Sequence, residues 1–240
     1  MDKTGAIPEE PGNGAGKVSG LREGLNLREK AYDRFTRHLL ARDILPGQFV
    51  SQRELVALTG LPLGAIRELV PRLEAEGLIK TVPQRGMQVA HVDLNLIRDA
   101  FQFRVFLERE AIALFTAEAP DTVLARLRHD HEVILAEGMA LGTGISHDLL
   151  ARAQAVDWDL HWTIVASLNN AIIADAYRVN SIKVRLIRQE QTLLSGALVL
   201  PVMREHLAII EAIETREPAR AVAAIDAHIT GARNRALGLR

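Results

Sequence analysis

The sequence of 240 residues is long enough for one large domain or two smaller ones, and its 48% hydrophobic and 25% charged residues are typical of a globular protein. A formal net charge of −1 excludes a generally polycationic protein but leaves room for a local basic face. Because the chain has no cysteine, disulfides, thiolate nucleophiles and zinc fingers are excluded, and a tightly bound metal ion would need His, Asp or Glu ligands.

The N-terminal segment 1–20 is rich in glycine, proline and small residues, which predicts a disordered leader. It lacks the apolar segment of a signal peptide, and no apolar run in the chain reaches the roughly 20 residues that span a bilayer. We therefore expect a cytoplasmic protein that does not bind membranes.

Residues 21–91 have the pattern of a winged helix-turn-helix. Apolar residues recur at helical spacing between residues 31 and 40, which predicts a first helix. Ser51 and Glu54 have the spacing of a capping box at the start of a short helix that Gly60 ends. A second short helix follows, and the apolar segments IKTV and MQVA then flank PQRG, which predicts a small β-hairpin as the wing.

Residues 92–240 predict an all-helical bundle, because no segment after Asp93 has the clear pattern of a strand. A loop is expected at 138–146, and Pro218 suits the first position of the last helix. The expected helices cover residues 94–119, 121–138, 148–168, 171–195 and 202–215, and a final one begins at 218. The predicted fold class is therefore mainly α, with the winged helix preceding the bundle.

The charge differs between these two predicted domains. Residues 20–91 hold 11 Lys and Arg against 8 Asp and Glu, whereas residues 92–240 hold 16 against 19. A basic module beside a mildly acidic helical one suits a DNA-binding domain joined to a sensing domain. The second helix of a helix-turn-helix enters the major groove, and each cation near it either contacts DNA or is a solvated surface charge. The available donors are Arg53 on the first short helix, Arg67 on the second, and Lys80 and Arg85 in the hairpin.

At these positions the segment PGQFVSQRELVALTGLPLGAIRELVPRLEAEGLIKTVPQRGMQV resembles the winged helix of the GntR family. The resemblance implies a homodimeric transcription regulator that binds a short palindromic operator in double-stranded DNA. It also implies DNA contacts at the matching positions Arg53, Arg67, Arg85 and Gly86. The resemblance rests on Pro46-Gly47, Glu54-Leu55, Gly60, Arg67-Glu68, Leu73-Glu74, Glu76-Gly77-Leu78 and Arg85-Gly86.

The start of the predicted recognition helix departs from the family. Where the family usually has a Ser/Thr-Arg-Thr-Pro run, this chain has Pro62-Leu63-Gly64-Ala65. Leu63 cannot donate a hydrogen bond to guanine but could contact a thymine methyl group, and Gly64 would lie beside it at the DNA. Pro71 lies well inside the same helix, where it removes one backbone hydrogen bond and is expected to bend the axis.

The segment DWDLH places Asp157 and His161 four residues apart, on one face of a predicted helix. His206 and His228 lie on two later amphipathic helices, among apolar residues that should face the bundle interior. Helical bundles build metal sites from such inward side chains, and one carboxylate with three imidazoles suits zinc, nickel, manganese or iron. From the residues alone, the alternative is a set of surface or hydrogen-bonded core histidines.

Residues 93–235 resemble the ligand-binding FCD domain of the FadR branch of GntR regulators. The segment FRVFLEREAIALFTAE, with Arg104 and Glu108, resembles its opening helix. Metal-binding members carry D-x-x-x-H on one helix and one histidine on each of the last two helices. The resemblance therefore implies a divalent metal ion, zinc in the first place, held by the matching residues Asp157, His161, His206 and His228.

The family senses small organic acids, so the resemblance also implies a carboxylic-acid effector that coordinates the metal ion. Arg104 is the first candidate for its counter-charge, and Asn180, Arg185 and Arg188 are further candidates for effector binding. The leading interpretation is a repressor whose operator affinity depends on this effector, and not an enzyme. The alternatives are a metal-dependent hydrolytic enzyme and a pure metal sensor. Asp159 and Glu205, the general bases nearest the motif, are expected to point elsewhere, which argues against the enzyme.

Overall fold

The computed structural model describes residues 15–142, 144–191 and 196–239 of the chain. The chain divides into two compact units, Met1–His91 and Val92–Arg240. Helix α1 begins at Ala15, within the predicted leader of residues 1–20, and residues 1–14 lie outside the described residues. Among the described helices, none is long and apolar enough to cross a membrane.

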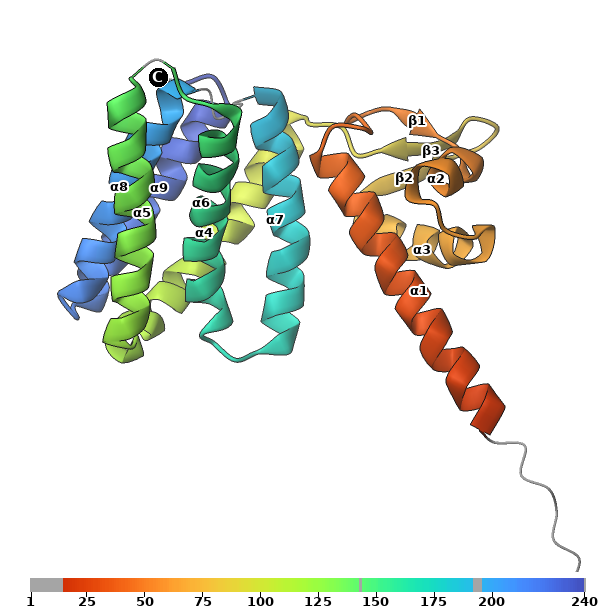
Figure 1. Cartoon of the computed structure of the whole chain (residues 1–240), viewed down its shortest axis with the longest axis horizontal. Helices are drawn as coiled ribbons and strands as arrows, with labels where there is room; N and C mark the ends of the chain where they lie inside the picture. Colours follow the sequence, from red (N-terminus) through yellow and green to blue (C-terminus); the bar gives the residue numbers. More distant parts are fainter. Residues whose placement is uncertain (1–14, 143, 192–195, 240) are drawn as a thin grey trace, which may run out of the picture. The chain divides into compact units, whose positions relative to one another are not determined.

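The first unit is a winged helix-turn-helix with three helices and a three-stranded antiparallel sheet among its described residues (Figure 1). The predicted hairpin is confirmed, and the sheet gains a short third strand that the sequence did not predict. The sheet order is β1-β3-β2. The elements are α1 (Ala15–Leu40), β1 (Phe49–Val50), α2 (Gln52–Thr59), α3 (Leu63–Ala75), β2 (Ile79–Val82) and β3 (Gly86–Val89).

The capping signals of α2 are confirmed. The Ser51 hydroxyl accepts from the Glu54 backbone N–H at 3.2 Å, and the Glu54 carboxylate accepts from the Ser51 N–H at 2.6 Å. Gly60 ends the helix with φ +64°, a left-handed conformation that favours glycine. These local signals fix the sharp turn between α2 and α3, and a side-chain cap of this kind contributes about 1 kcal/mol.

The recognition helix α3 runs through Pro71, which is exposed at its surface. Ile66, Leu69 and Leu73 form the buried apolar face of this helix, and all three are 0% exposed. On the wing, Gly86 has φ +93°, and a Cβ atom there would lie 3.0 Å from the Val50 carbonyl oxygen. Glycine is therefore required where β3 approaches β1.

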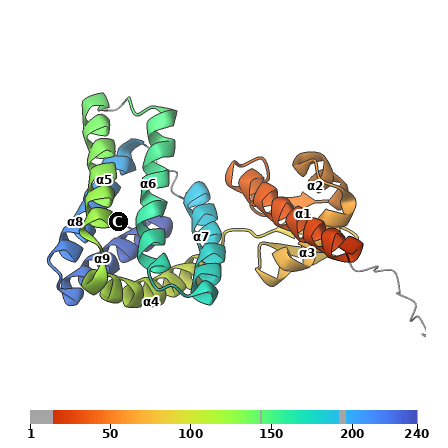
Figure 2. The same cartoon turned by 60° about the horizontal axis from the view of Figure 1, so that its bottom comes forward.

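The second unit is all-helical in its described residues, which confirms the predicted fold class (Figures 1 and 2). Helix α4 packs against α6, α7 and α9, and α5 packs against α6 and α8. The expected loop starts later than predicted, since α5 continues to Leu141, and α8 begins before residue 202, with Pro201 inside it. The helices are α4 (Leu94–Glu118), α5 (Asp121–Leu141), α6 (His147–Ala166), α7 (Ala171–Gln191), α8 (Gly196–Glu214) and α9 (Pro218–Ala236).

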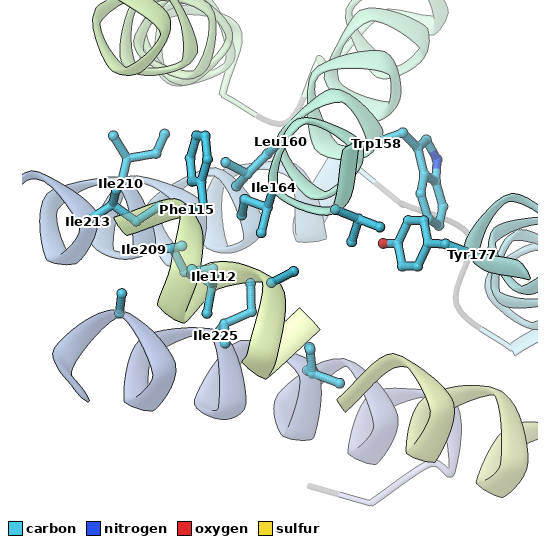
Figure 3. Close-up of a cluster of buried hydrophobic side chains, with 14 of the residues drawn as sticks. Ile112, Phe115, Trp158, Leu160, Ile164, Tyr177, Ile209, Ile210, Ile213 and Ile225 are labelled. Carbon is cyan, nitrogen blue, oxygen red and sulfur yellow. The ribbon is translucent and has the colours of Figure 1, made fainter. Parts of the chain in front are cut away.

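The bundle is held together by a large apolar cluster to which α4, α6, α8 and α9 all contribute (Figure 3). Isoleucines dominate it, for example Ile112 on α4, Ile164 on α6 and Ile225 on α9, each 0% exposed. A set of polar side chains is buried in the same unit, and such groups are costly unless they are paired or bind a ligand. They include Arg104, Glu108, His131, Asp157, His161, His206 and His228.

Candidate metal centre and DNA-binding surface

Three of the four predicted metal ligands meet inside the bundle. His161 lies on α6, His206 on α8 and His228 on α9, and one ring nitrogen of each lies within 4.8 Å of the other two. The Nε2 atoms of His206 and His228 are 3.3 Å apart, and the His161 ring centroid is 5.1 Å from that of either partner. All three side chains are buried, so the cluster is an interior feature and not a surface patch.

Asp157 lies one helical turn before His161, as the spacing predicts. Its Oδ1 atom is 3.9 Å from Nε2 of His161, and its Oδ2 atom accepts a 2.7 Å hydrogen bond from Arg188 Nη1. Oδ1 is buried and has no hydrogen-bond partner among the described residues. The carboxylate is therefore anchored at one oxygen and presents the other oxygen toward the histidines.

The outer nitrogen of each histidine is held by a neighbouring group. Nδ1 of His161 donates to Glu108 at 2.7 Å, and Nδ1 of His228 donates to Glu205 at 2.8 Å. Nδ1 of His206 is 3.1 Å from Nε2 of His131, whose own Nδ1 donates to the Leu127 carbonyl at 2.7 Å. The Nδ1 atoms of all three clustered histidines therefore carry the proton, and their Nε2 atoms are lone-pair acceptors.

The electrostatics favour this protonation pattern. Burial lowers the pKa of His228 to about 4 and the pKa of His206 well below its ordinary value. Although burial alone would raise it, Arg104 and His161 lower the pKa of Glu108 to about 2. Hydrogen bonds from His228 and Arg235 likewise lower the pKa of Glu205 to about 2 against the effect of burial. At neutral pH, the ionised Glu205 carboxylate therefore lies behind a neutral His228 imidazole, the form in which histidine binds a metal ion.

The cluster fits a divalent cation. Inward-facing lone pairs of His206 and His228 at 3.3 Å repel one another, and Nε2 of His161 and Oδ1 of Asp157 are buried without partners. A cation between the three histidine nitrogens would satisfy those acceptors at once, and Asp157 Oδ1 lies beside His161 as a fourth donor. Three imidazole nitrogens and one carboxylate oxygen are a donor set suited to zinc and its first-row neighbours.

The four predicted effector residues divide into two groups. A small cavity of about 20 Å³ next to the histidines is lined by Arg104, Arg188 and Arg235, together with His228. Arg104 is paired with Glu108 through Nε, while its buried Nη2 has no partner among the described residues. Asn180 and Arg185 do not line this cavity.

These two residues make other contacts. The Asn180 amide donates to the Ala100 carbonyl at 3.1 Å, and the Arg185 guanidinium lies 4.7 Å from the centroid of the Trp158 ring. The structure therefore brings Arg104 and Arg188 to the cavity beside the histidine cluster but leaves Asn180 and Arg185 elsewhere.

Five of the six predicted DNA-contact residues are exposed on the winged helix, and the sixth, Gly86, is half-buried. Arg53 on α2 and Arg67 on α3 are exposed, and Leu63 at the start of α3 is 38% exposed. A Cβ atom at Gly64 would have nothing within 4 Å, so this position is open for close approach. In the wing, the Arg85 guanidinium lies 4.4 Å from the Phe49 ring centroid, beside Gly86. This arrangement presents cations from both the recognition helix and the wing.

Sequence reasoning missed part of the shell around the histidines. The expectation that Glu205 points elsewhere is wrong, because this carboxylate holds Nδ1 of His228. His131 was not predicted, yet it supports His206 and is 0% exposed. A signal was present, since His131 follows Leu124 and Leu127 at helical spacing on the buried face of α5.

The fold and the site together define a winged-helix protein whose helical bundle encloses a histidine and carboxylate centre. Residues 99–231 match the FCD domain, and the chain belongs to the FCD-domain family. The E. coli protein McbR/YncC has a similar structure, with 16% identity and a TM-score of 0.68 over 85% of this chain and 94% of that one. A putative GntR regulator from Rhodococcus sp. RHA1 gives 16% identity and a TM-score of 0.68 over 93% and 99% of the two chains. The chain therefore has the fold of GntR regulators.

Two relatives by sequence are transcriptional regulators. The Nta operon transcriptional regulator of Aminobacter aminovorans is 27% identical over 143 residues, which are 60% of this chain and 64% of the relative. An HTH-type transcriptional regulator of Streptomyces ambofaciens is 30% identical over 101 residues, 42% of this chain and 43% of the relative. The chain thus spans less than two thirds of the length of either relative, and both names describe regulators and not enzymes.

Proposed function

We propose that the protein is a DNA-binding transcription regulator whose operator affinity is controlled by a small organic acid at a divalent-metal centre. The observation that carries this proposal is the set of inward-facing acceptors on Asp157, His161, His206 and His228, in a chain that also has a winged helix. The regulator names of the relatives from Aminobacter aminovorans and Streptomyces ambofaciens support it.

In this proposal those four residues hold the metal ion, with zinc as the first expectation and nickel, manganese or iron as alternatives. A divalent ion that accepts five or six ligands would supply open coordination positions for a carboxylate. Arg104 has an unpartnered, buried Nη2 atom, and Arg188 lines the same cavity, so both can offer charge to an anionic effector. These cations would favour an acid over a neutral ligand.

The winged helix binds double-stranded DNA in this proposal. Arg67 enters the major groove with α3, Arg53 and Arg85 contact phosphates, and Leu63 meets a thymine methyl group beside the open position of Gly64. Two recognition helices must reach successive major grooves about 34 Å apart, so the protein acts as a two-fold homodimer on a palindrome. Effector binding releases the DNA, which makes the protein a repressor.

The metal part of the proposal is tested by elemental analysis of the purified full-length protein. We expect about one divalent metal ion per chain, as four protein ligands form one site. His206→Ala should lose it, while His147→Ala, which changes an exposed histidine at the start of α6, should keep it. A metal-free wild-type protein that takes up no zinc on addition would contradict the proposal.

The regulatory part is tested by titration of DNA selected from a random duplex pool. Wild-type protein should release this DNA when a carboxylic acid is added at constant zinc. A pure metal sensor would instead respond to zinc alone. Sedimentation should show a dimer at micromolar concentration without DNA, and a monomer would count against the homodimer.

A further inference from the structure

An open groove lies between α6 and α7, with a volume of about 400 Å³. Its walls include both tryptophans of the sequence, Trp158 and Trp162, together with Tyr177 and Arg185. It shares no lining residue with the small cavity at the histidines, and none of the four proposed metal ligands lines it. The groove is therefore a separate feature of the bundle, and its size is in the range of small-molecule sites.

Two residues that line this groove each hold a buried side-chain nitrogen without an acceptor. Trp158 is only 8% exposed, and its Nε1 atom has no partner among the described residues; the same is true of the buried Nε atom of Arg185. In Figure 3 the Trp158 nitrogen points away from the apolar cluster, whereas the Tyr177 hydroxyl points toward the interior. Buried donors are normally satisfied, so these two indicate a missing acceptor.

The positive charge of Arg185 also favours a ligand in the groove. Burial lowers the pKa of Arg185, and the charge of Asp157 only partly offsets this effect. Its guanidinium is 4.7 Å from the Trp158 ring centroid, which fixes its plane against the indole. Asp159 also lines the groove, but Arg126 already binds its carboxylate at 2.6 Å. An anionic ligand would therefore meet a net attraction beside Arg185.

Two further aromatic rings line the groove. Trp162 is 41% exposed, and its ring centroid is 6.4 Å from that of Tyr177. The Tyr177 hydroxyl donates to Glu108 at 2.8 Å, so this ring is held from behind and offers its side to the groove. Such rings favour a flat aromatic partner over a purely aliphatic one.

We propose that the groove between α6 and α7 binds an aromatic monocarboxylate, whose carboxylate pairs with the Arg185 guanidinium beside the Trp158 indole while its ring packs against Trp162 and Tyr177. The site does not depend on the proposed metal centre, because it uses none of the same side chains. It gives the bundle a second small-molecule site with a different preference, for an anion that carries a ring.

The test uses the intrinsic tryptophan fluorescence of the full-length protein, because both tryptophans line the groove. Titration with benzoate should give a saturable change with a dissociation constant of about 1 mM or tighter. Acetate, which lacks the ring, and benzyl alcohol, which lacks the charge, should each bind at least about tenfold more weakly. A linear response to benzoate up to about 50 mM would overturn the proposal.

Variants locate the binding. Arg185→Gln should weaken benzoate binding at least about tenfold, while Arg220→Gln, which changes an exposed arginine of α9, should not alter it. Trp162→Ala removes an exposed ring with little risk to folding and should also weaken binding, with Trp158 left as the reporter. Unchanged affinity in both groove variants would overturn the proposal.

His206→Ala separates the groove from the proposed metal centre. If benzoate binds in the groove, this variant keeps the fluorescence response. If the response disappears in His206→Ala but persists in Arg185→Gln, the acid binds at the metal centre and the groove proposal is wrong, while the proposed function stands. If His206→Ala still contains metal but benzoate binding depends on Arg185, the proposed function fails and the groove proposal stands.

Discussion

Replacing Glu205 by glutamine tests whether the histidine cluster is a metal centre, since Glu205 is not itself a ligand. Its Oε2 atom holds Nδ1 of His228 at 2.8 Å, and both carboxylate oxygens accept from Arg235, at 2.8 and 3.0 Å. Glu205→Gln keeps the size and one acceptor but removes the negative charge behind the imidazole. The amide nitrogen must then face either His228 or Arg235, both of which are donors.

The expected cost falls on metal affinity. Outer carboxylates of this kind raise the basicity of the ligand histidine and fix its tautomer, and their removal typically weakens metal binding by about 10–100-fold. That loss corresponds to about 1.4–2.7 kcal/mol of binding free energy. The stability of the metal-free protein should fall by no more than about 1 kcal/mol, because Glu205 and Arg235 are both partly open to solvent.

The assay is competition for zinc against a chromophoric chelator, with denaturant unfolding of the metal-free proteins measured beside it. Glu211→Gln is the matched control, because Glu211 is an exposed residue of the same helix and its substitution removes the same charge. Equal zinc affinity of wild type and Glu205→Gln would refute the role of Glu205. A loss of stability in the metal-free variant as large as the loss of zinc affinity would show that the contact only supports the fold.

Three further results are expected. Chelation should lower the melting temperature of the bundle by about 5–10 °C, because a ligand present at 100 times its dissociation constant stabilises the folded state by about 2.7 kcal/mol. Calorimetry with and without chelator measures this shift, and an unchanged melting temperature would argue against a bound ion. Arg67→Ala should weaken binding to selected DNA by about 1–3 kcal/mol with metal content unchanged, and a DNA titration at physiological salt showing full affinity would contradict the placement of α3 in the groove. Gly86→Ala should destabilise the winged helix by about 1–3 kcal/mol in denaturant unfolding, because φ is +93° and the new Cβ meets the Val50 carbonyl; a stability equal to wild type would mean that the wing readily shifts.

Local signals in the sequence were sufficient to predict most of the helices and the hairpin. Ser51, Glu54 and Gly60 act on backbone groups within four residues, so their effect is independent of the rest of the structure. Pro218 likewise starts α9 where a missing N–H has no cost. The strand β1 was missed because two residues carry no alternation, and only pairing with β3 defines it.

The candidate site was predictable only in part. The spacing of Asp157 and His161 fixes their common face, because both lie on one helix. The contact of Glu205 with His228 depends on how α8 lies against α9, and helical spacing gives a direction only relative to the helix's own axis. For the same reason the sequence did not predict the contact between His131 and His206, since the two residues are 75 positions apart on α5 and α8.

One titration asks directly whether an organic acid at the histidine centre controls DNA binding. Selected operator DNA is titrated with wild-type protein and with His206→Ala, at constant zinc, with and without candidate carboxylic acids. We expect the acid to weaken DNA binding by wild type but to leave His206→Ala bound, because a ligand shifts an equilibrium only through its different affinity for the two states. Release of DNA from His206→Ala by the same acid would contradict it and would place the sensing site elsewhere.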